Sequence, residues 1–536
     1  MRRFSSYGPI NNMLHYYAPR EELINRAYIQ LMGENPSEGG HYITVWAPRQ
    51  CGKTWIMQQV LFRLQKDPQF DVLKINLENL TDETRVGTII DTIAGEILEG
   101  LNKPITTIKT QAKFQEIFKR DFLDKPLILI LDEFDALQEA AINAVVSAFR
   151  NIYIKRLDEV AKPTGQKSYL LHAVALIGVR SVLGIENKKG SPFNIQRSVH
   201  IPNLTFDEVF NLFGWYEKES GQKIEPAVIE NLYRETNGQP GLTCWFGELL
   251  TEGFEEYTND KSRPITPDNF AEVLAAAVSI LPNNNILNII SKASEEEHKN
   301  TVLDLFKTNQ KVEFTYDDKS LNFLYMNGVI DREKEFPTKY YVKFASPFVQ
   351  KRLFNYFSRE LFHYMGKLYD TFDIPENVIT RTRLEIRNLL RLYETYLKKN
   401  RGWLLKDAPR RSDMRIFEAV YHFNLYSYLK QFLGTEGGNV IPEFPTGNGK
   451  IDLIITYAGE QYGLEVKSYS TRGNYSHALV HAAQYGKQLG LEEIFLVFFV
   501  DVIDEENRGR YEKDYQDETT GVKVVPIFVE TGPAGE

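Results

Sequence analysis

Four short apolar segments, separated by longer amphipathic stretches, constrain the fold of this chain more than any other feature. They are YITVW (42–46), VLKINL (72–77), LILIL (127–131) and HAVALIGV (172–179). Aliphatic and β-branched residues without polar alternation are typical of parallel strands buried on both faces. The intervening segments are long enough for the crossover helices that parallel strands need. We therefore predict an α/β core with a parallel sheet, and a further strand in SVHIPNL (198–204).

The first of these strands leads into WAPRQCGKTW (46–55), which is close to the phosphate-binding pattern GxxxxGK[ST]. In that pattern, backbone N–H groups of the loop and of the following helix surround nucleotide phosphates. Ala47 replaces the first glycine, at a position that needs unusual backbone less strictly than Gly52 does. We predict ATP as the cofactor, with Lys53 on its β- and γ-phosphates and Thr54 on Mg²⁺. The predicted loop contacts are Arg49, Gln50, Cys51, Gly52, Lys53 and Thr54. Cys51 is more readily interpreted as a small space-filling residue than as a redox group.

A second phosphate motif is PLILILDEFDAL (126–137), in which a buried strand ends in two acids. Asp132 would hold Mg²⁺ through water, and Glu133 would polarise the attacking water. Either motif alone could be a helix cap or a solvated strand end, but both in order favour a nucleotide site. Arg180 follows the fourth strand, where it is either a phosphate sensor or a surface arginine.

These motifs resemble the AAA-like and STAND-type ATPases of prokaryotes. The resemblance also rests on YYAPREEL (16–23), LIGVR and NGQPGL, and it covers roughly residues 10 to 360. It implies that Arg20 lies near the nucleotide and that NGQPGL takes part in a lid over it. It further implies a helical lid and a winged-helix unit after the nucleotide core.

At 536 residues the chain is long enough for three or four domains. We predict a multidomain α/β protein, and the expected parts follow in chain order. They are a P-loop ATPase core (1–204), a helical lid (205–282), a winged-helix-like domain (283–360), a basic helical linker (361–411) and a C-terminal α/β domain (412–536).

The C-terminal part contains the predicted hairpin GKIDLIITYAGEQYGLEVKS (449–468), whose apolar strands carry Asp452, Glu465 and Lys467. These residues are either solvated strand ends or a metal site, because carboxylates on adjacent strands can hold Mg²⁺ or Mn²⁺. The pattern resembles the D…ExK core of the PD-(D/E)xK nuclease superfamily, with a restriction-endonuclease-like fold over roughly 412 to 530. The resemblance implies that Asp452 and Glu465 bind the metal and that Lys467 orients water or neutralises charge.

Two flanking helices fit the same resemblance. Glu418 occupies the place of a helical acid that often completes such metal sites. Gln484, followed by Tyr485, resembles a polar residue on the helix after the ExK strand, which implies a catalytic role. His477 and His481 lie one helical turn apart without a third ligand, so we interpret them as surface or core residues.

The segment 381–411 contains ten lysines and arginines against three acids, although the whole chain has a net charge of -9. Such an excess suits phosphate contacts, and Tyr393, Tyr396 and Trp403 could stack on bases. An amphipathic helix with buried aromatics explains the segment equally well.

The sequence thus favours an ATP-regulated, metal-dependent nuclease, with DNA favoured over RNA as partner and a homo-oligomer allowed. The alternative is a nucleotide-switched interaction or DNA-binding protein whose nuclease-like domain does not cut. A translocating motor is less supported, because there is no second P-loop. Two cysteines, no signal peptide and no long apolar run predict a cytoplasmic protein without membrane contact.

Overall fold

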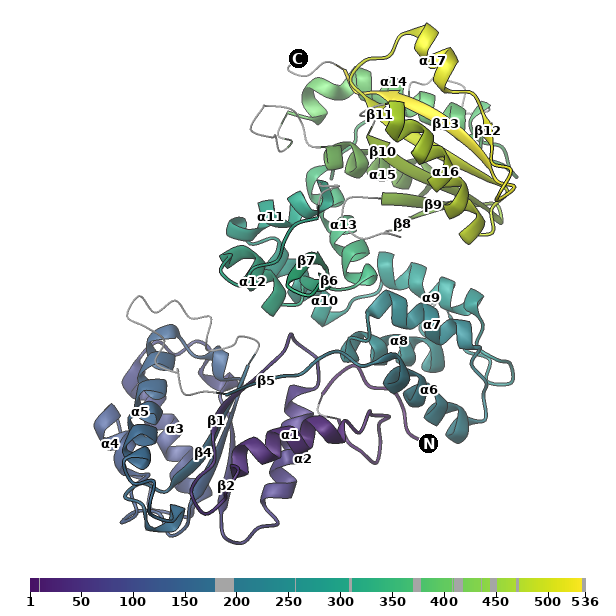
Figure 1. Cartoon of the computed structure of the whole chain (residues 1–536). Coiled ribbons are helices and arrows are strands. Elements are labelled where there is room, and N and C mark those ends of the chain that lie inside the picture. The colour runs from purple at the N-terminus through teal and green to yellow at the C-terminus, as the bar shows by residue number, and fades with distance from the viewer. Residues whose placement is uncertain are drawn as a thin grey trace. The chain divides into compact units, whose positions relative to one another are not determined.

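The computed structural model divides the chain into two compact units, coloured along the chain in Figure 1. Unit 1 comprises Met1–Phe270 with Met326–Gly328, and unit 2 comprises Ala271–Tyr325 with Val329–Glu536. The structure describes residues 1–8, 10–178, 197–255, 257–307, 311–369, 377–406, 408, 418–434, 436–443, 451–468 and 472–532. Each unit is described by itself.

Unit 1 is built on a five-stranded sheet with the order β2-β3-β4-β1-β5, and all of its strand pairs are parallel. The strands are β1 (Tyr42–Trp46), β2 (Asp71–Asn76), β3 (Leu127–Asp132), β4 (Leu171–Gly178) and β5 (Arg197–His200). Every residue of β1, β3 and β4 is buried, as the uninterrupted apolar runs predict. The predicted parallel sheet is therefore confirmed, with β2 and β5 as its edges.

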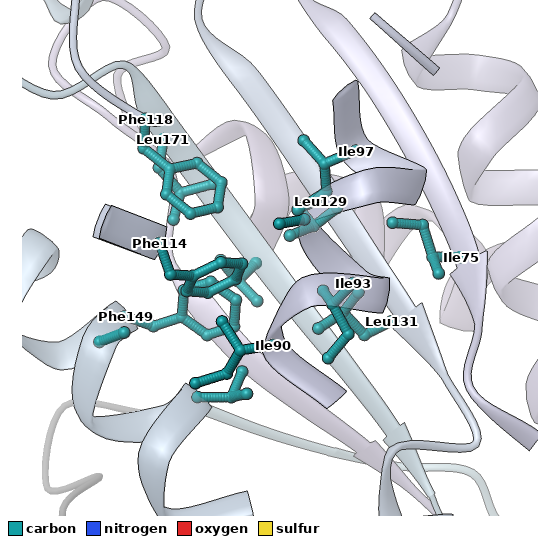
Figure 2. Close-up of a cluster of buried hydrophobic side chains, with 14 of the residues drawn as sticks. Ile75, Ile90, Ile93, Ile97, Phe114, Phe118, Leu129, Leu131, Phe149 and Leu171 are labelled. Atoms are coloured by element: carbon teal, nitrogen blue, oxygen red, sulfur yellow. The ribbon is translucent and has the colours of Figure 1, made fainter. Parts of the chain in front are cut away.

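Helices cover both faces of this sheet, as Figure 1 shows. On one face lie α1 (Glu21–Met32) and α2 (Lys53–Leu64), and on the other lie α3 (Val86–Gly100), α4 (Gln111–Glu116) and α5 (Glu139–Leu157). Successive residues of a strand point to opposite faces, so β3 contributes its odd-numbered residues to one core and its even-numbered residues to the other. Figure 2 shows the first of these cores, where isoleucines of α3 pack against Phe149 of α5 and Leu129 and Leu131 of β3.

Three further helices complete unit 1, namely α6 (Phe206–Ser220), α7 (Pro226–Thr236) and α8 (Pro240–Glu252). The predicted capping box is present: Thr205 accepts from the Glu208 amide, and the Glu208 side chain accepts from the Thr205 amide. The turn between α7 and α8 uses left-handed backbone, with φ 50° at Asn237 and 66° at Gly238. The turn expected from Gly and Pro in NGQPG is therefore confirmed.

Unit 2 begins with helices and a hairpin. They are α9 (Pro267–Ser279, which starts in unit 1), α10 (Asn284–Ala293), α11 (Glu296–Lys307), α12 (Lys319–Met326), the antiparallel strands β6 (Ile330–Phe336) and β7 (Lys339–Phe344), and α13 (Pro347–Leu361). This order agrees with the expected elements, while the winged-helix assignment stays a prediction. Among the described residues, no single helix is long and apolar enough to cross a membrane. In the part of the chain that the structure describes, α9 and α10 are the only pair of helices with sufficient combined length and composition, and they are bent by 48° at their junction.

The second part of unit 2 is a six-stranded mixed sheet with the order β12-β13-β11-β10-β9-β8. Its strands are β8 (Asn439–Glu443), β9 (Ile451–Tyr457), β10 (Glu460–Ser468), β11 (Glu493–Val500), β12 (Tyr515–Gln516) and β13 (Lys523–Glu530). Its helices are α14 (Ile386–Leu404), α15 (Glu418–Gly434), α16 (Arg472–Gln488) and α17 (Glu505–Tyr511). Apolar residues of α16 pack on alternate residues of β11 and β13. The expected α/β domain is thus present as a sheet domain that contains the predicted hairpin.

The expected linker 361–411 includes α14, which packs on β13. Arg387 of α14 lies 2.7 Å from Asp514, and Lys398 lies 2.8 Å from Glu530. Arg391 pairs with Glu512. This part of the expected linker is therefore built into the sheet domain.

Candidate functional site

The phosphate-binding loop connects β1 to α2 and has the backbone that its sequence requires. Gly52 has a φ of 86°, a left-handed conformation that residues with a Cβ rarely adopt. Gln50 is also left-handed, with a φ of 57°, whereas Ala47 has no positive φ. The loop therefore accepts alanine at its start, and α2 begins at Lys53 directly behind it.

Lys53 is almost completely buried, and its ammonium group turns back onto the loop. Its Nζ donates to the carbonyl oxygens of Ala47 and Pro48, each at 2.9 Å. Burial lowers the pKa of Lys53, while nearby Cys51 and then Glu133 act in the opposite direction. The lysine is thus held at the loop by neutral acceptors, which a phosphate group can replace with stronger, charged ones.

Asp132, the last residue of β3, and Glu133, which follows it, lie beside this loop. Asp132 is 2% exposed, and its Oδ2 lies 2.8 Å from Nζ of Lys74 on β2. Glu133 has a left-handed φ of 54°, and burial raises its pKa although the charge of Lys53 opposes this. A raised pKa suits a group that accepts a proton from water near neutral pH. Lys74 was not predicted, because its contact with Asp132 requires β2 to be the neighbour of β3.

The start of α8 contacts the phosphate-binding loop directly. Nε2 of Gln239 donates to the carbonyl of Arg49 at 3.0 Å, and the Gly241 amide donates to the carbonyl of Gln50 at 3.1 Å. A Cβ atom on Gly241 would lie 2.4 Å from Oε1 of Gln50, so only glycine fits there without displacement. The NGQPGL segment thus contacts the phosphate-binding loop, and its expected role in a lid over the nucleotide stays a prediction.

The other predicted nucleotide residues have more varied surroundings. The Arg20 side chain contacts Glu208 at 3.2 Å and the carbonyls of Pro202 and Asn203 at 2.8 and 3.0 Å. It thus secures the segment between β5 and α6. Cys51 is 2% exposed within the core shared by α1 and α2, which agrees with a space-filling role. Thr54 is half-buried in the first turn of α2, Arg49 is exposed, and Arg180 lies outside the described residues.

In unit 2, the predicted acidic residues meet on adjacent strands. Glu465 of β10 lies directly opposite Asp452 of β9 in the antiparallel register, so both side chains leave the same face of the sheet. Each of the two residues is 2% exposed. Lys467 forms an ion pair with Oε1 of Glu465, as its position two residues further on the same strand face allows.

His481 of α16 is a further residue of this group, and it was interpreted only as a surface or core residue. Its Nδ1 lies 2.9 Å from Oε1 of Glu465. Gln484 is exposed and lies three residues further along α16, so it shares a helix face with His481. Glu418 is the first residue of α15, and its side chain is not among those described.

The donor set suits a divalent cation with part of its coordination supplied by water. Oε2 of the buried Glu465 has no hydrogen-bond partner among the described residues. Carboxylate oxygens are the ligands that Mg²⁺ and Mn²⁺ prefer, and Mg²⁺ commonly keeps several waters. Within the described ranges, no three His, Cys, Asp or Glu side chains converge to hold an ion. Strands β9 and β10 therefore provide two facing carboxylates as possible metal ligands.

The tyrosines of the basic segment 381–411 do not fit the nucleic-acid interpretation. Tyr393 and Tyr396 are 0% and 3% exposed, so they cannot stack on bases, whereas Trp403 is 46% exposed. Several cations of α14 are paired with acids of the C-terminal sheet domain, as described above. The amphipathic-helix interpretation therefore holds for these two tyrosines and for the paired cations.

Comparison with known proteins bears on unit 1. Residues 37–161, well under half of the chain, match the model of the AAA domain family. The match covers the phosphate-binding loop, Asp132 and Glu133. The match supports the P-loop ATPase part of the prediction, with ATP as the expected nucleotide.

Several solved structures show weaker similarity. The Orc1 protein of Aeropyrum pernix in complex with DNA is 15% identical over 63% of this chain and 93% of its own, with a TM-score of 0.33. A Walker-type ATPase of Pyrococcus abyssi is 17% identical over 63% and 96%, with a TM-score of 0.39. The RuvB branch migration motor of Thermotoga maritima is 14% identical over 61% and 92%, with a TM-score of 0.32. TM-scores this low do not establish a shared overall fold. No curated protein matches the chain.

Proposed function

We propose that this chain hydrolyses ATP in unit 1 and cleaves nucleic acid in a metal-dependent reaction on the C-terminal sheet of unit 2. The observation that carries the nuclease proposal is the register of β9 and β10. It sets two buried carboxylates, Asp452 and Glu465, opposite each other, with Lys467 on one of them. A purely structural role does not explain two buried acids that face each other, because burying charge costs free energy unless the charge is compensated.

For ATP, the residues of the AAA domain have distinct tasks. Lys53 exchanges the carbonyls of Ala47 and Pro48 for phosphate oxygens, and Thr54 with Asp132 would hold Mg²⁺. Glu133, whose pKa is raised by burial, would act as the base that orients the attacking water. The Gln239 and Gly241 contacts then transmit the state of the loop to the helices α6 to α8.

For the phosphodiester, Asp452 and Glu465 would hold Mg²⁺ or Mn²⁺. The cation supplies an activated water and stabilises negative charge on the phosphate. Lys467 adds a positive charge beside Glu465, and Gln484 can hydrogen-bond substrate or water from α16. His481 positions Glu465 by holding its Oε1.

The test is cleavage of labelled DNA and RNA by the purified full chain with Mg²⁺ or Mn²⁺, with and without ATP. We expect metal-dependent cleavage that is lost in Asp452→Ala and Lys467→Ala. Glu460→Ala is the matched control, because Glu460 is an exposed acid at the start of the same strand. Lys53→Ala should abolish ATP hydrolysis and change cleavage only in the presence of ATP. Absence of cleavage on both polymers, or equal cleavage by Asp452→Ala, would refute the nuclease proposal.

A second candidate is a nucleotide-switched interaction protein that does not cut. The pairing of Arg387, Arg391 and Lys398 with acids favours it, because paired cations are less available for phosphates. Such a protein would form no cleavage product, and Asp452→Ala would leave its partner binding unchanged. A nuclease would form product as wild type and would lose product formation, but not binding, in Asp452→Ala.

A further inference from the structure

A third carboxylate continues the row formed by Asp452 and Glu465. Glu443, the last residue of β8, lies opposite Asp452 in the antiparallel register, just as Glu465 does on the other side. Directly opposite residues of antiparallel strands have their side chains on one face, with Cβ atoms about 5 Å apart. Three acids on three adjacent strands therefore start from neighbouring positions on the same face.

The side chain of Glu443 does not join the other two carboxylates. Its Oε1 lies 2.6 Å from Nζ of Lys351, which belongs to α13. Lys351 is 0% exposed, and 23% of the Glu443 side chain is exposed. This contact explains why three acids in register do not converge on one point within the described ranges.

A fully buried ammonium group needs a counter-ion, because burial of an unpaired charge is strongly unfavourable. Glu443 is one such counter-ion of Lys351. A divalent cation between Asp452 and Glu465 would compete for the same carboxylate, since each added acidic ligand strengthens cation binding. Within this row, Oε2 of the buried Glu465 has no hydrogen-bond partner in the described part of the chain and could therefore accept a cation.

We propose that Glu443 is a third metal-binding carboxylate that Lys351 withholds, so that the position of α13 sets the cation affinity of the site. This inference rests on the metal site proposed above and adds its regulation. Helix α13 directly follows the β6–β7 hairpin in the chain, so the helical part of unit 2 has a direct ionic contact with the acidic row.

The experiment is a titration of the full chain with Mn²⁺ alone, followed by calorimetry and by the shift in melting temperature. Lys351→Met should bind Mn²⁺ at least about tenfold more tightly than wild type, because the released carboxylate adds a negative ligand. Glu443→Gln and the double variant with Lys351→Met should both lack this gain in Mn²⁺ affinity, because neither has the third carboxylate. Lys430→Met is the control: this half-buried lysine of α15 contacts neutral Asn355 and Tyr426, so its loss should leave Mn²⁺ affinity unchanged.

The outcomes separate this inference from the proposed function. If wild type binds Mn²⁺, Asp452→Asn abolishes the binding and Lys351→Met does not strengthen it, the inference is overturned and the metal site stands. Equally tight Mn²⁺ binding by Lys351→Met and by the double variant also overturns it, because loss of the lysine charge, and not Glu443, would then explain the gain. If Lys351→Met does not fold, Lys351→Gln takes its place in the same comparison. If no variant binds Mn²⁺, the metal site itself fails and the inference with it.

Discussion

Acidification should destabilise the sheet of unit 1 through one buried histidine, His172 of β4. Its Nε2 lies 3.1 Å from the carbonyl of Met32, and its Nδ1 lies 3.2 Å from Oγ1 of Thr164. Arg156 donates to the same Thr164 oxygen at 2.9 Å. In the neutral ring, Nε2–H donates to Met32 and Nδ1 accepts from the Thr164 hydroxyl. A proton on Nδ1 would remove the acceptor for the Thr164 hydroxyl and would place a positive charge near the guanidinium group of Arg156.

The magnitude follows from the pKa of this ring. Burial, and then the charge of Arg156, lower the pKa of His172 from 6.5 to about 3. The unfolded chain therefore takes up a proton first as pH falls. The stabilisation that comes from keeping this ring neutral is fully present above pH 6.5, the pKa in the unfolded chain. It is lost progressively as pH falls from 6.5 to about 3, the pKa in the folded chain. From about pH 7 to about pH 5 the loss is about 2 kcal/mol, since one pKa unit corresponds to about 1.4 kcal/mol.

The assay is hydrogen exchange of peptides from β1 and β4, corrected for the pH dependence of intrinsic exchange. Wild type should lose about 2 kcal/mol more opening free energy between about pH 7 and about pH 5 than His172→Gln does. His422→Gln is the control, because His422 lies in unit 2, where burial lowers its pKa to about 4. An equal loss in wild type and His172→Gln would refute the assignment of this pH dependence to His172.

Two further predictions concern packing and the lid contact. Phe149→Ala should cost about 3–5 kcal/mol in urea unfolding, because Phe149 is 0% exposed in the core of Figure 2. Ile154→Ala on the same helix, where 42% of the side chain is exposed, should cost less than about 1 kcal/mol. Gln239→Ala should lower the free energy of unfolding by about 1 kcal/mol, because the Leu242 amide loses the cap acceptor of α8. The same change should also weaken ATP binding. Gln239→Glu keeps the cap acceptor but loses the donor to Arg49, so unchanged ATP affinity in that variant would contradict the proposed lid contact.

The sheet of unit 1 could be predicted closely because its strands are buried on both faces. Such strands appear in a sequence as uninterrupted apolar runs, and the expected range 42–46 is identical with β1. The phosphate-binding loop was predictable for a related reason. Its chemistry depends on residues adjacent in sequence, and the φ of Gly52 shows the local backbone demand that selects glycine.

The polar contacts that complete each site could not be predicted in the same way. The pairs Lys74–Asp132 and His481–Glu465 join residues on different elements, so they depend on strand order and helix docking. The basic segment was ambiguous for the same reason, because composition counts charges without their partners. Lys398 counts as a free cation in the sequence, but in the fold it lies between Glu394 and Glu530.

These pairs share a physical logic that bears on metal binding in both units. Three of the acids proposed to bind a cation, or to be withheld from one, already have a lysine beside them, as in Lys74–Asp132, Lys467–Glu465 and Lys351–Glu443. A buried carboxylate without a counter-ion would destabilise the metal-free protein, so the internal lysine keeps the fold stable when no cation is bound. The same lysine weakens cation binding by charge repulsion, unless a phosphate enters with the metal and takes over the lysine as its own partner. Cation affinity at both sites should therefore rise in the presence of a phosphate-bearing ligand, nucleotide in unit 1 and nucleic acid in unit 2.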